Sequence, residues 1–131
     1  MQYTKDFKAW SQVKESIHNK SGNPPGYKER EIWWAQLGVN IGDEEDGKGI
    51  SFSRPVLIVK GFSRSLVWVV PLTSAEKHGK YYYSFVLNDS ISTALLSQLK
   101  ALDVRRFTQR MGVIEEKSFT ELKQELLAFF V

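Results

Sequence analysis

The stretches GDEEDGKGISFSRPVLIV, at residues 42–59, and VWVVPLTS, at residues 67–74, decide the expected fold of this chain. The first passes from an acidic, glycine-rich loop through Arg54-Pro55 into an apolar run, and the second is an apolar run that ends in Pro-Leu-Thr-Ser. Short runs rich in β-branched residues are typical of strands buried on both faces. The order therefore predicts a cation, Arg54, and a hydroxyl, Thr73, at the ends of neighbouring core strands.

On either side of these two stretches, the sequence predicts further short strands and helices. Residues 55–60 and 66–70 are the two predicted core strands, and the short connection at 61–65 makes them a hairpin. Four other segments have the apolar or alternating pattern of strands, at residues 31–37, 81–87, 102–107 and 111–114. Apolar residues at helical spacing predict helices at 91–99 and 118–130. We expect an α+β fold, mainly β, in which mostly antiparallel strands form a small barrel.

The two ends of the chain carry the clearest helical signals. Residues 5–19 are amphipathic, and Trp10 is expected to dock this helix onto the barrel. A Pro-Pro pair then stops the helix, so residues 1–28 form an N-terminal helical extension with its linker and residues 29–131 form the barrel domain. In the C-terminal helix, Ser118 and Glu121 have the S-x-x-E spacing of a capping box.

Composition restricts the classes of function. A chain of 131 residues folds as one domain without covalent staples. Cysteine is absent, which excludes disulfides and thiolate metal sites. The N-terminus lacks the apolar core of a signal peptide and no apolar run reaches membrane-spanning length, so we expect a cytoplasmic protein. The formal net charge of +3 permits a nucleic-acid partner without demanding one.

Three patterns that suggest other chemistry are weak. Residues 42–48 match most of the phosphate-loop pattern, but Gly49 stands where magnesium binding needs Ser or Thr, and four carboxylates fill the loop. The same acidic run lacks the spacing of a calcium-binding EF-hand. His18 lies in the N-terminal helix and His78 in a loop, so neither a paired-histidine nuclease nor a metal hydrolase is indicated.

Arg54 and Thr73 each have a structural and a functional interpretation. Arg54 is either a rim arginine paired with Asp46 or Glu45, or a guanidinium that clamps a phosphate. Thr73, with Ser74, either satisfies backbone groups of a turn or contacts a phosphate. The residues alone leave these interpretations open, and the expected closeness of the two side chains favours a functional site.

Several short pieces of the sequence form an ordered set. They are EIWWAQL, Glu45-Asp46-Gly47, Arg54-Pro55-Val56, VVPLTS, Ser97-Gln98-Leu99, Leu102-Asp103 with Arg105-Arg106, and Met111-Gly112-Val113-Ile114. Together their order and spacing resemble the MazF/PemK toxin endoribonucleases of bacterial toxin–antitoxin systems. The resemblance covers residues 30–131 and leaves out the first helix.

The resemblance implies a compact SH3-like barrel that forms a homodimer. It also implies sequence-specific, metal-independent cleavage of single-stranded RNA, which inhibits translation and growth and needs no cofactor. The 2′-hydroxyl attacks the adjacent phosphorus and leaves a 2′,3′-cyclic phosphate and a 5′-hydroxyl. A cognate antitoxin protein is the implied partner, and no contact with a membrane is expected.

The resemblance also assigns site residues. Arg54 matches the family's catalytic arginine, Thr73 its catalytic hydroxyl and Glu45 its loop glutamate. Further polar residues of the motifs are expected to contact RNA, namely Lys48, Ser53, Ser74, Gln98 and Arg105. A preorganised guanidinium stabilises the charge that builds on phosphate oxygens. Arginine is nearly always protonated, so Arg54 is a poor general base. It is assigned charge stabilisation and proton donation to the leaving oxygen, and Glu45 is the candidate base.

Two features depart from the family pattern. The loop between Glu45 and Arg54 is longer than usual, and the N-terminal segment is additional. That segment is expected either to cover the groove for an antitoxin peptide or to extend the dimer interface. Two other functions remain as alternatives, a non-catalytic SH3-like module that binds RNA or protein and a gyrase-poisoning toxin of the same fold.

Overall fold

The structure is a computed structural model that describes residues 3–131. Its helices and strands, in chain order, are α1 (Phe7–His18), β1 (Glu31–Gln36), β2 (Ser53–Gly61), β3 (Leu66–Thr73), β4 (Tyr82–Leu87), β5 (Ser90–Leu95), β6 (Lys100–Asp103), β7 (Phe107–Val113) and α2 (Glu116–Leu127). Short 3-10 helices η1 (Leu96–Gln98), η2 (Val104–Arg106) and η3 (Ala128–Phe130) complete the set. Among the described residues, no helix is long and apolar enough to cross a membrane.

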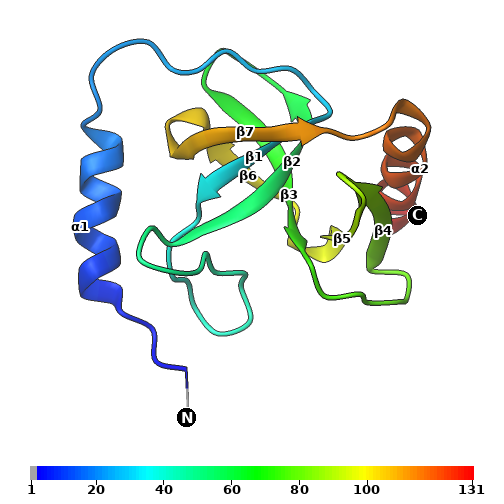
Figure 1. Cartoon of the computed structure of the whole chain (residues 1–131), viewed down its shortest axis with the longest axis horizontal. Coiled ribbons are helices and arrows are strands. Elements are labelled where there is room, and N and C mark those ends of the chain that lie inside the picture. The colour runs from blue at the N-terminus through cyan, green and yellow to red at the C-terminus, as the bar shows by residue number, and fades with distance from the viewer. Residues whose placement is uncertain (1–2) are drawn as a thin grey trace.

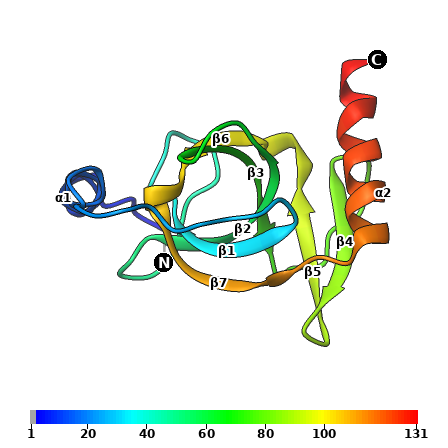
Figure 2. The same ribbon diagram turned by 90° about the horizontal axis from the view of Figure 1, so that it is seen from above.

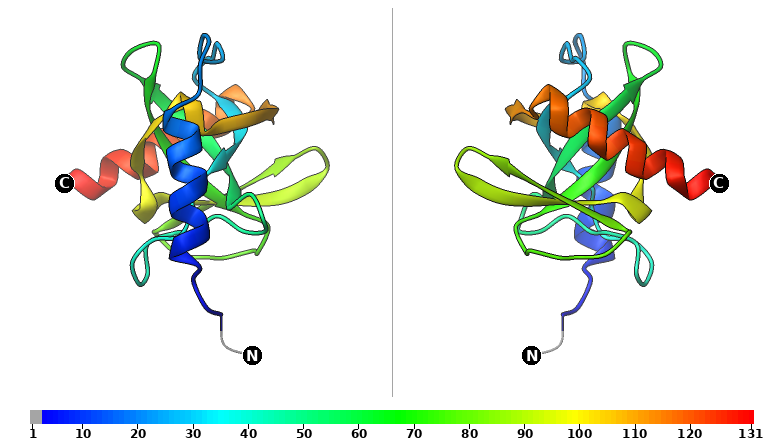
Figure 3. Two further views of the ribbon diagram at one scale, coloured as in Figure 1. Left: turned by 90° about the vertical axis from the view of Figure 1, so that its left-hand side faces the viewer. Right: turned by 90° about the vertical axis from the view of Figure 1, so that its right-hand side faces the viewer.

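The strands form one strongly curved antiparallel sheet. Its order is β4-β5-β3-β2-β1-β7, and β6 pairs with β3 beside that path. Every strand pair is antiparallel, and the sheet curls around the core into a half-open barrel (Figures 1 and 2). The two α-helices lie at opposite sides of this barrel (Figure 3). The predicted α+β, mainly β, SH3-like barrel with a helix from each end of the chain is therefore confirmed.

The β2–β3 hairpin forms the centre of the sheet, as its apolar runs predict. Val56 to Val59 and Val69 to Leu72 are buried, because neighbouring strands flank them and other parts of the protein cover both faces of the curved sheet here. Helix α2 closes one side of the core with its apolar stripe, in which Phe119, Leu122 and Leu126 are buried. Full burial of such side chains stabilises a fold by about 1.5–3 kcal/mol each.

The predicted helix at residues 91–99 is wrong. The segment forms β5 and then the short η1 helix, because β4 and β5 make a hairpin with Val86 paired to Ile91 and Leu87 to Ser90. Asn88 and Asp89 form its turn with positive φ angles of 51° and 64°. Asn and Asp tolerate that left-handed conformation, which suits the tight turns of hairpins. This turn makes residues 91–95 a strand despite their helical spacing.

Two smaller predictions also need correction. Residues 102–107 do not form one strand, because β6 ends at Asp103 and the η2 helix follows before β7 begins. The capping box at Ser118 is wrong as well. Helix α2 begins at Glu116 with Glu115 as its N-cap, so Ser118 already lies inside the first turn.

The N-terminal helix docks through Trp10, as predicted. Trp10 is buried and packs at 5.5 Å between ring centroids against Phe52, while the Arg106 guanidinium lies 5.8 Å from its ring. Gly38 has a φ of +78°, and a Cβ there would lie 1.9 Å from the Trp10 ring, so a side chain at position 38 is excluded. Helix α1 therefore rests on the loop that joins β1 to β2, at residues 37–52, which we call the acidic loop.

Candidate active site

Arg54 and Thr73 lie opposite each other at one end of the central hairpin. In the β2–β3 pairing, Val56 faces Pro71. Continuing that antiparallel register by two residues on each strand places Arg54 across from Thr73. The Arg54 Nη1 donates to the Leu72 carbonyl at 3.2 Å, which fixes the arginine against the end of β3.

Both residues line one cavity on the surface of the barrel. The cavity has a volume of about 620 Å³ and an apolar wall formed by Trp34, Pro55, Leu72 and Met111. Five predicted site residues line it together, namely Lys48, Ser53, Arg54, Thr73 and Ser74. Sites that bind small polar groups are concave and mostly apolar, with a few convergent polar side chains. The geometry therefore brings a cation and several hydroxyls to one solvent-connected hollow.

The Arg54 guanidinium is held by three protein groups. Its Nε donates to the Asp46 carbonyl at 2.8 Å, and its Nη2 lies 2.7 Å from the Glu45 carboxylate. Only 9% of the side chain is exposed, although it reaches the cavity wall. Because a guanidinium has five N–H donors, donors remain on its terminal nitrogens for an incoming anion. Arg54 therefore makes the predicted ion pair with Glu45 and also borders the cavity, while its contact with a phosphate stays a prediction.

Gln98 fixes the acidic loop rather than the cavity. Its Oε1 accepts from the Glu45 amide at 3.2 Å, and its Nε2 donates to the Asp43 carbonyl at 3.1 Å. Asn40 adds a second brace, because its Nδ2 donates to the Glu45 carbonyl at 2.9 Å. These bonds hold the backbone of Glu45 so that its carboxylate meets Arg54.

The Thr73 hydroxyl has a turn role that leaves its proton available. Its Oγ1 accepts from the Ala75 amide at 3.2 Å, which is the interaction expected of a hydroxyl in a turn. A hydroxyl that accepts one bond still has one proton to donate. Thr73 is partly exposed, so a ligand in the cavity has access to that proton.

Arg105 lies away from the cavity. It forms an ion pair with Asp103 at 3.0 Å and donates through Nη1 to the His18 carbonyl at 2.9 Å, at the end of α1. The hydrogen bond to Asp103 raises the pKa of Arg105 above its ordinary value, and the same bond lowers the pKa of Asp103. In this arrangement Arg105 contributes to the docking of α1.

Sequence reasoning missed part of the cavity wall. Polar side chains from three other segments also line it, namely Ser51, Ser92, Thr108 and Gln109. They come from the acidic loop, β5 and β7, which meet only after the sheet has curled. The alternation of polar and apolar residues predicts which side of each strand is exposed. It does not predict which exposed sides come together in the folded sheet. No group of three metal-ligating side chains occurs among residues 3–131.

The curved sheet, α2 and the hollow at the Arg54 end of the hairpin define the protein as a half-open antiparallel barrel with a candidate site at one end of its central hairpin. The family model described as "PemK-like, MazF-like toxin of type II toxin-antitoxin system" matches residues 28–130. The chain therefore belongs to the PemK/MazF toxin family. The match leaves out nearly all of the N-terminal extension, and the division into segments at 1–28 and 29–131 stays a prediction. Comparison with curated proteins finds no match.

Solved structures share the fold at low sequence identity. MazF from Deinococcus radiodurans superposes with a TM-score of 0.65 at 18% identity, covering 83% of this chain and 98% of that one. The Mycobacterium tuberculosis toxin MazF-mt6 gives a TM-score of 0.58 at 19% identity, with coverage of 77% and 96%. An endoribonuclease in complex with its cognate antitoxin, from a mycobacterial species, gives 0.60 at 13% identity, with coverage of 80% and 95%.

Proposed function

We propose that this chain is a sequence-specific, metal-independent endoribonuclease toxin that cleaves single-stranded RNA and thereby inhibits translation and growth. Membership in the PemK/MazF toxin family supports the toxin role. The main support for the proposed catalytic activity is that Arg54 and Thr73, from neighbouring strands, line the same cavity. Lys48 and Ser74 line the same hollow and are proposed to contact the RNA backbone, with Ser53 beside them.

The proposed reaction is a transesterification within the RNA. The 2′-oxygen bonds to the adjacent phosphorus as the bond from phosphorus to the 5′-oxygen breaks, which leaves a 2′,3′-cyclic phosphate and a 5′-hydroxyl. Glu45 takes the proton of the 2′-hydroxyl, and Arg54 gives a proton to the leaving 5′-oxygen. After the products leave, the Glu45–Arg54 ion pair forms again, and its 2.7 Å separation in the free protein offers a direct path that returns the proton to the arginine. Thr73 donates its hydroxyl proton to a phosphate oxygen.

We propose that RNA binding at Arg54 moves Glu45. A phosphate can reach the remaining donors of the guanidinium, but it then lies beside the Glu45 carboxylate, and the two anions repel each other. The acidic loop therefore shifts when RNA enters, which moves Glu45 from Arg54 toward the 2′-hydroxyl. Charge stabilisation by a preorganised donor commonly contributes about a hundred- to thousandfold in rate.

The proposal includes the partners that suit this role. A cognate antitoxin protein would bind the toxin, as the mycobacterial endoribonuclease binds its own antitoxin. We also propose that the chain forms a homodimer and acts in the cytoplasm, where its RNA substrate is translated. Gel filtration with light scattering tests the dimer, and co-expression with the product of the neighbouring reading frame tests the antitoxin.

The test of the activity is cleavage of a long unstructured RNA in the presence of a chelator. We expect fragments with 5′-hydroxyl ends from the wild type and a loss of at least about a hundredfold in rate for Arg54→Ala. Arg64→Ala is the matched control, because Arg64 is exposed in the β2–β3 connection and does not line the cavity. Equal fragment patterns for wild type and Arg54→Ala would refute the assignment. Binding to a gyrase fragment without cleavage would favour the gyrase-poisoning alternative.

A further inference from the structure

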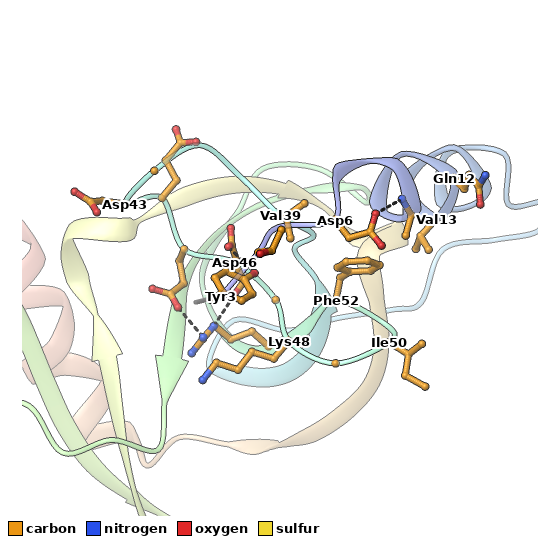
Figure 4. A pocket seen from close by; sticks show the side chains of 18 residues that line it. Tyr3, Asp6, Gln12, Val13, Val39, Asp43, Asp46, Lys48, Ile50 and Phe52 are labelled. Carbon is orange, nitrogen blue, oxygen red and sulfur yellow. Dashed lines mark hydrogen bonds and ion pairs between the residues drawn. The ribbon is translucent and has the colours of Figure 1, made fainter. Parts of the chain in front are cut away.

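The segment ahead of α1 reaches across to the acidic loop. Lys5 donates from Nζ to the Asn40 carbonyl at 2.5 Å and to the Gly42 carbonyl at 3.1 Å, and it pairs with the Asp46 carboxylate at 3.2 Å. Tyr3 donates its phenol proton to the same carboxylate at 3.0 Å. Figure 4 shows the pocket between this segment and the acidic loop, in which Tyr3 lies beside Asp46, and Asp6 lies at the start of α1. Lys5 therefore binds three points of one loop.

Asp46 connects these contacts to Arg54. Its carboxylate accepts from the Asn40 amide at 2.7 Å as well as from Lys5, while its own backbone carbonyl accepts from the Arg54 Nε at 2.8 Å. The preceding residue, Glu45, supplies the carboxylate paired with Arg54. Asp46 is therefore the single residue between Lys5 and the Arg54 guanidinium, and a movement of Asp46 alters two of the contacts of Arg54.

The loop is also held at both of its ends. Trp10 packs against Phe52 at the end of the loop, and Gly38 at its start leaves the space that the Trp10 ring occupies. The Phe52 carbonyl accepts from the Gly38 amide at 3.1 Å, so the two ends are joined under the indole. Helix α1 thus fixes the base of the loop, and Lys5 fixes its middle.

We propose that Lys5 is a positioning residue that keeps the acidic loop closed on Arg54. It acts through Asp46, and its effect on RNA cleavage rests on the proposed function. In the closed arrangement Glu45 neutralises the guanidinium that a phosphate must reach. Lys5 stabilises this arrangement, so it raises the cost of opening and weakens the binding of RNA. The N-terminal extension, which lies outside the matched family region, thereby restrains the site.

The direct test is the reactivity of Arg54 toward phenylglyoxal, followed by mass spectrometry. We expect the rate of modification at Arg54 to rise about three- to tenfold in Lys5→Ala. This is the size of effect expected when one partly buried ion pair and its hydrogen bonds to the loop are lost. Lys5→Arg should restore the slow rate, because a guanidinium can bind the same oxygens. Lys8→Ala is the matched control, since Lys8 is exposed in the first turn of α1, close to Lys5 in the chain, and the exposed Arg64 is the internal reference.

Kinetics with RNA separates this proposal from the proposed function. Lys5→Ala should lower KM about three- to tenfold and leave kcat within about twofold, since the Lys5–Asp46 ion pair opposes the binding of RNA and not the chemical step. If Arg54 is modified at the wild-type rate in a folded Lys5→Ala variant, the role of Lys5 is overturned. A fall in kcat with no change in KM also overturns it. If modification of Arg54 rises while no variant cleaves RNA, the nuclease proposal fails and the control of Arg54 by Lys5 stands.

Discussion

The substitution Glu45→Gln tests the ion pair at the centre of the site. It removes the charge that faces Arg54 at 2.7 Å and keeps the size of the side chain. Leaving one partner of a buried ion pair without its counter-charge costs about 3–5 kcal/mol. The Glu45 side chain is 23% exposed and glutamine retains an oxygen acceptor, so the expected loss is smaller, about 1–2 kcal/mol.

This loss is measurable by thermal unfolding. For a domain of this length, 1–2 kcal/mol corresponds to a midpoint lowered by about 3–8 °C. In RNA cleavage, removal of a general base is expected to lower kcat by about a hundredfold or more. Glu44→Gln is the matched control, because Glu44 is an exposed neighbour in the same loop whose carboxylate accepts from the Ile41 amide instead.

Two results would refute this reasoning. An unfolding midpoint of Glu45→Gln equal to that of wild type would mean that the ion pair adds nothing to stability. Wild-type kcat in the same variant would remove Glu45 from the reaction and leave Arg54 without its proposed proton partner. A destabilised variant with full activity would keep the structural role of Glu45 and refute the catalytic one.

Three further outcomes follow from the contacts in the structure. Gly38→Ala should cost about 2–5 kcal/mol in chemical unfolding, because its positive φ and the Trp10 ring both exclude a side chain, whereas Gly26→Ala should be neutral. Thr73→Val should lower the rate of RNA cleavage about a hundredfold and change the unfolding midpoint by only a few degrees, since it removes one exposed hydrogen bond. The hydrogen bond from Arg105 lowers the pKa of Asp103 in the folded state, so its stabilisation is present above the unfolded pKa and is lost as pH falls through the folded one. In acid titrations, Asp103→Asn should therefore weaken the decline of stability below about pH 4.

Much of the fold was predictable because its signals are local. The apolar runs around Val56 and Val69 identify core strands wherever they lie, and the amphipathic pattern with Trp10 identifies a docked helix. The segment at 91–99 was not predictable from its spacing, because the turn at Asn88 and Asp89 and the pairing with β4 decide its conformation. Pairing partners lie outside the window in which periodicity is read.

The candidate site was predictable in its centre and not in its surroundings. Arg54 and Thr73 follow from two strands adjacent in sequence, so a hairpin register brings them together. Gln98 and Arg105 belong to the same motifs, yet they brace the acidic loop and the end of α1. The sequence also gave no sign that Lys5 would reach Asp46, since this contact spans 41 positions.

The sequence by itself determined both α-helices and most of the strands, which side chains are apolar enough to be buried, and that a guanidinium and a hydroxyl lie at the ends of two adjoining strands. The tertiary structure alone decided that Glu45 pairs with Arg54 and that Lys5, from the N-terminal extension, pairs with Asp46 in the acidic loop. The physical reason is the distance along the chain over which each effect acts. Backbone preference and periodicity act over a few residues, whereas the charge state and accessibility of a site depend on which distant groups the packed chain places beside it.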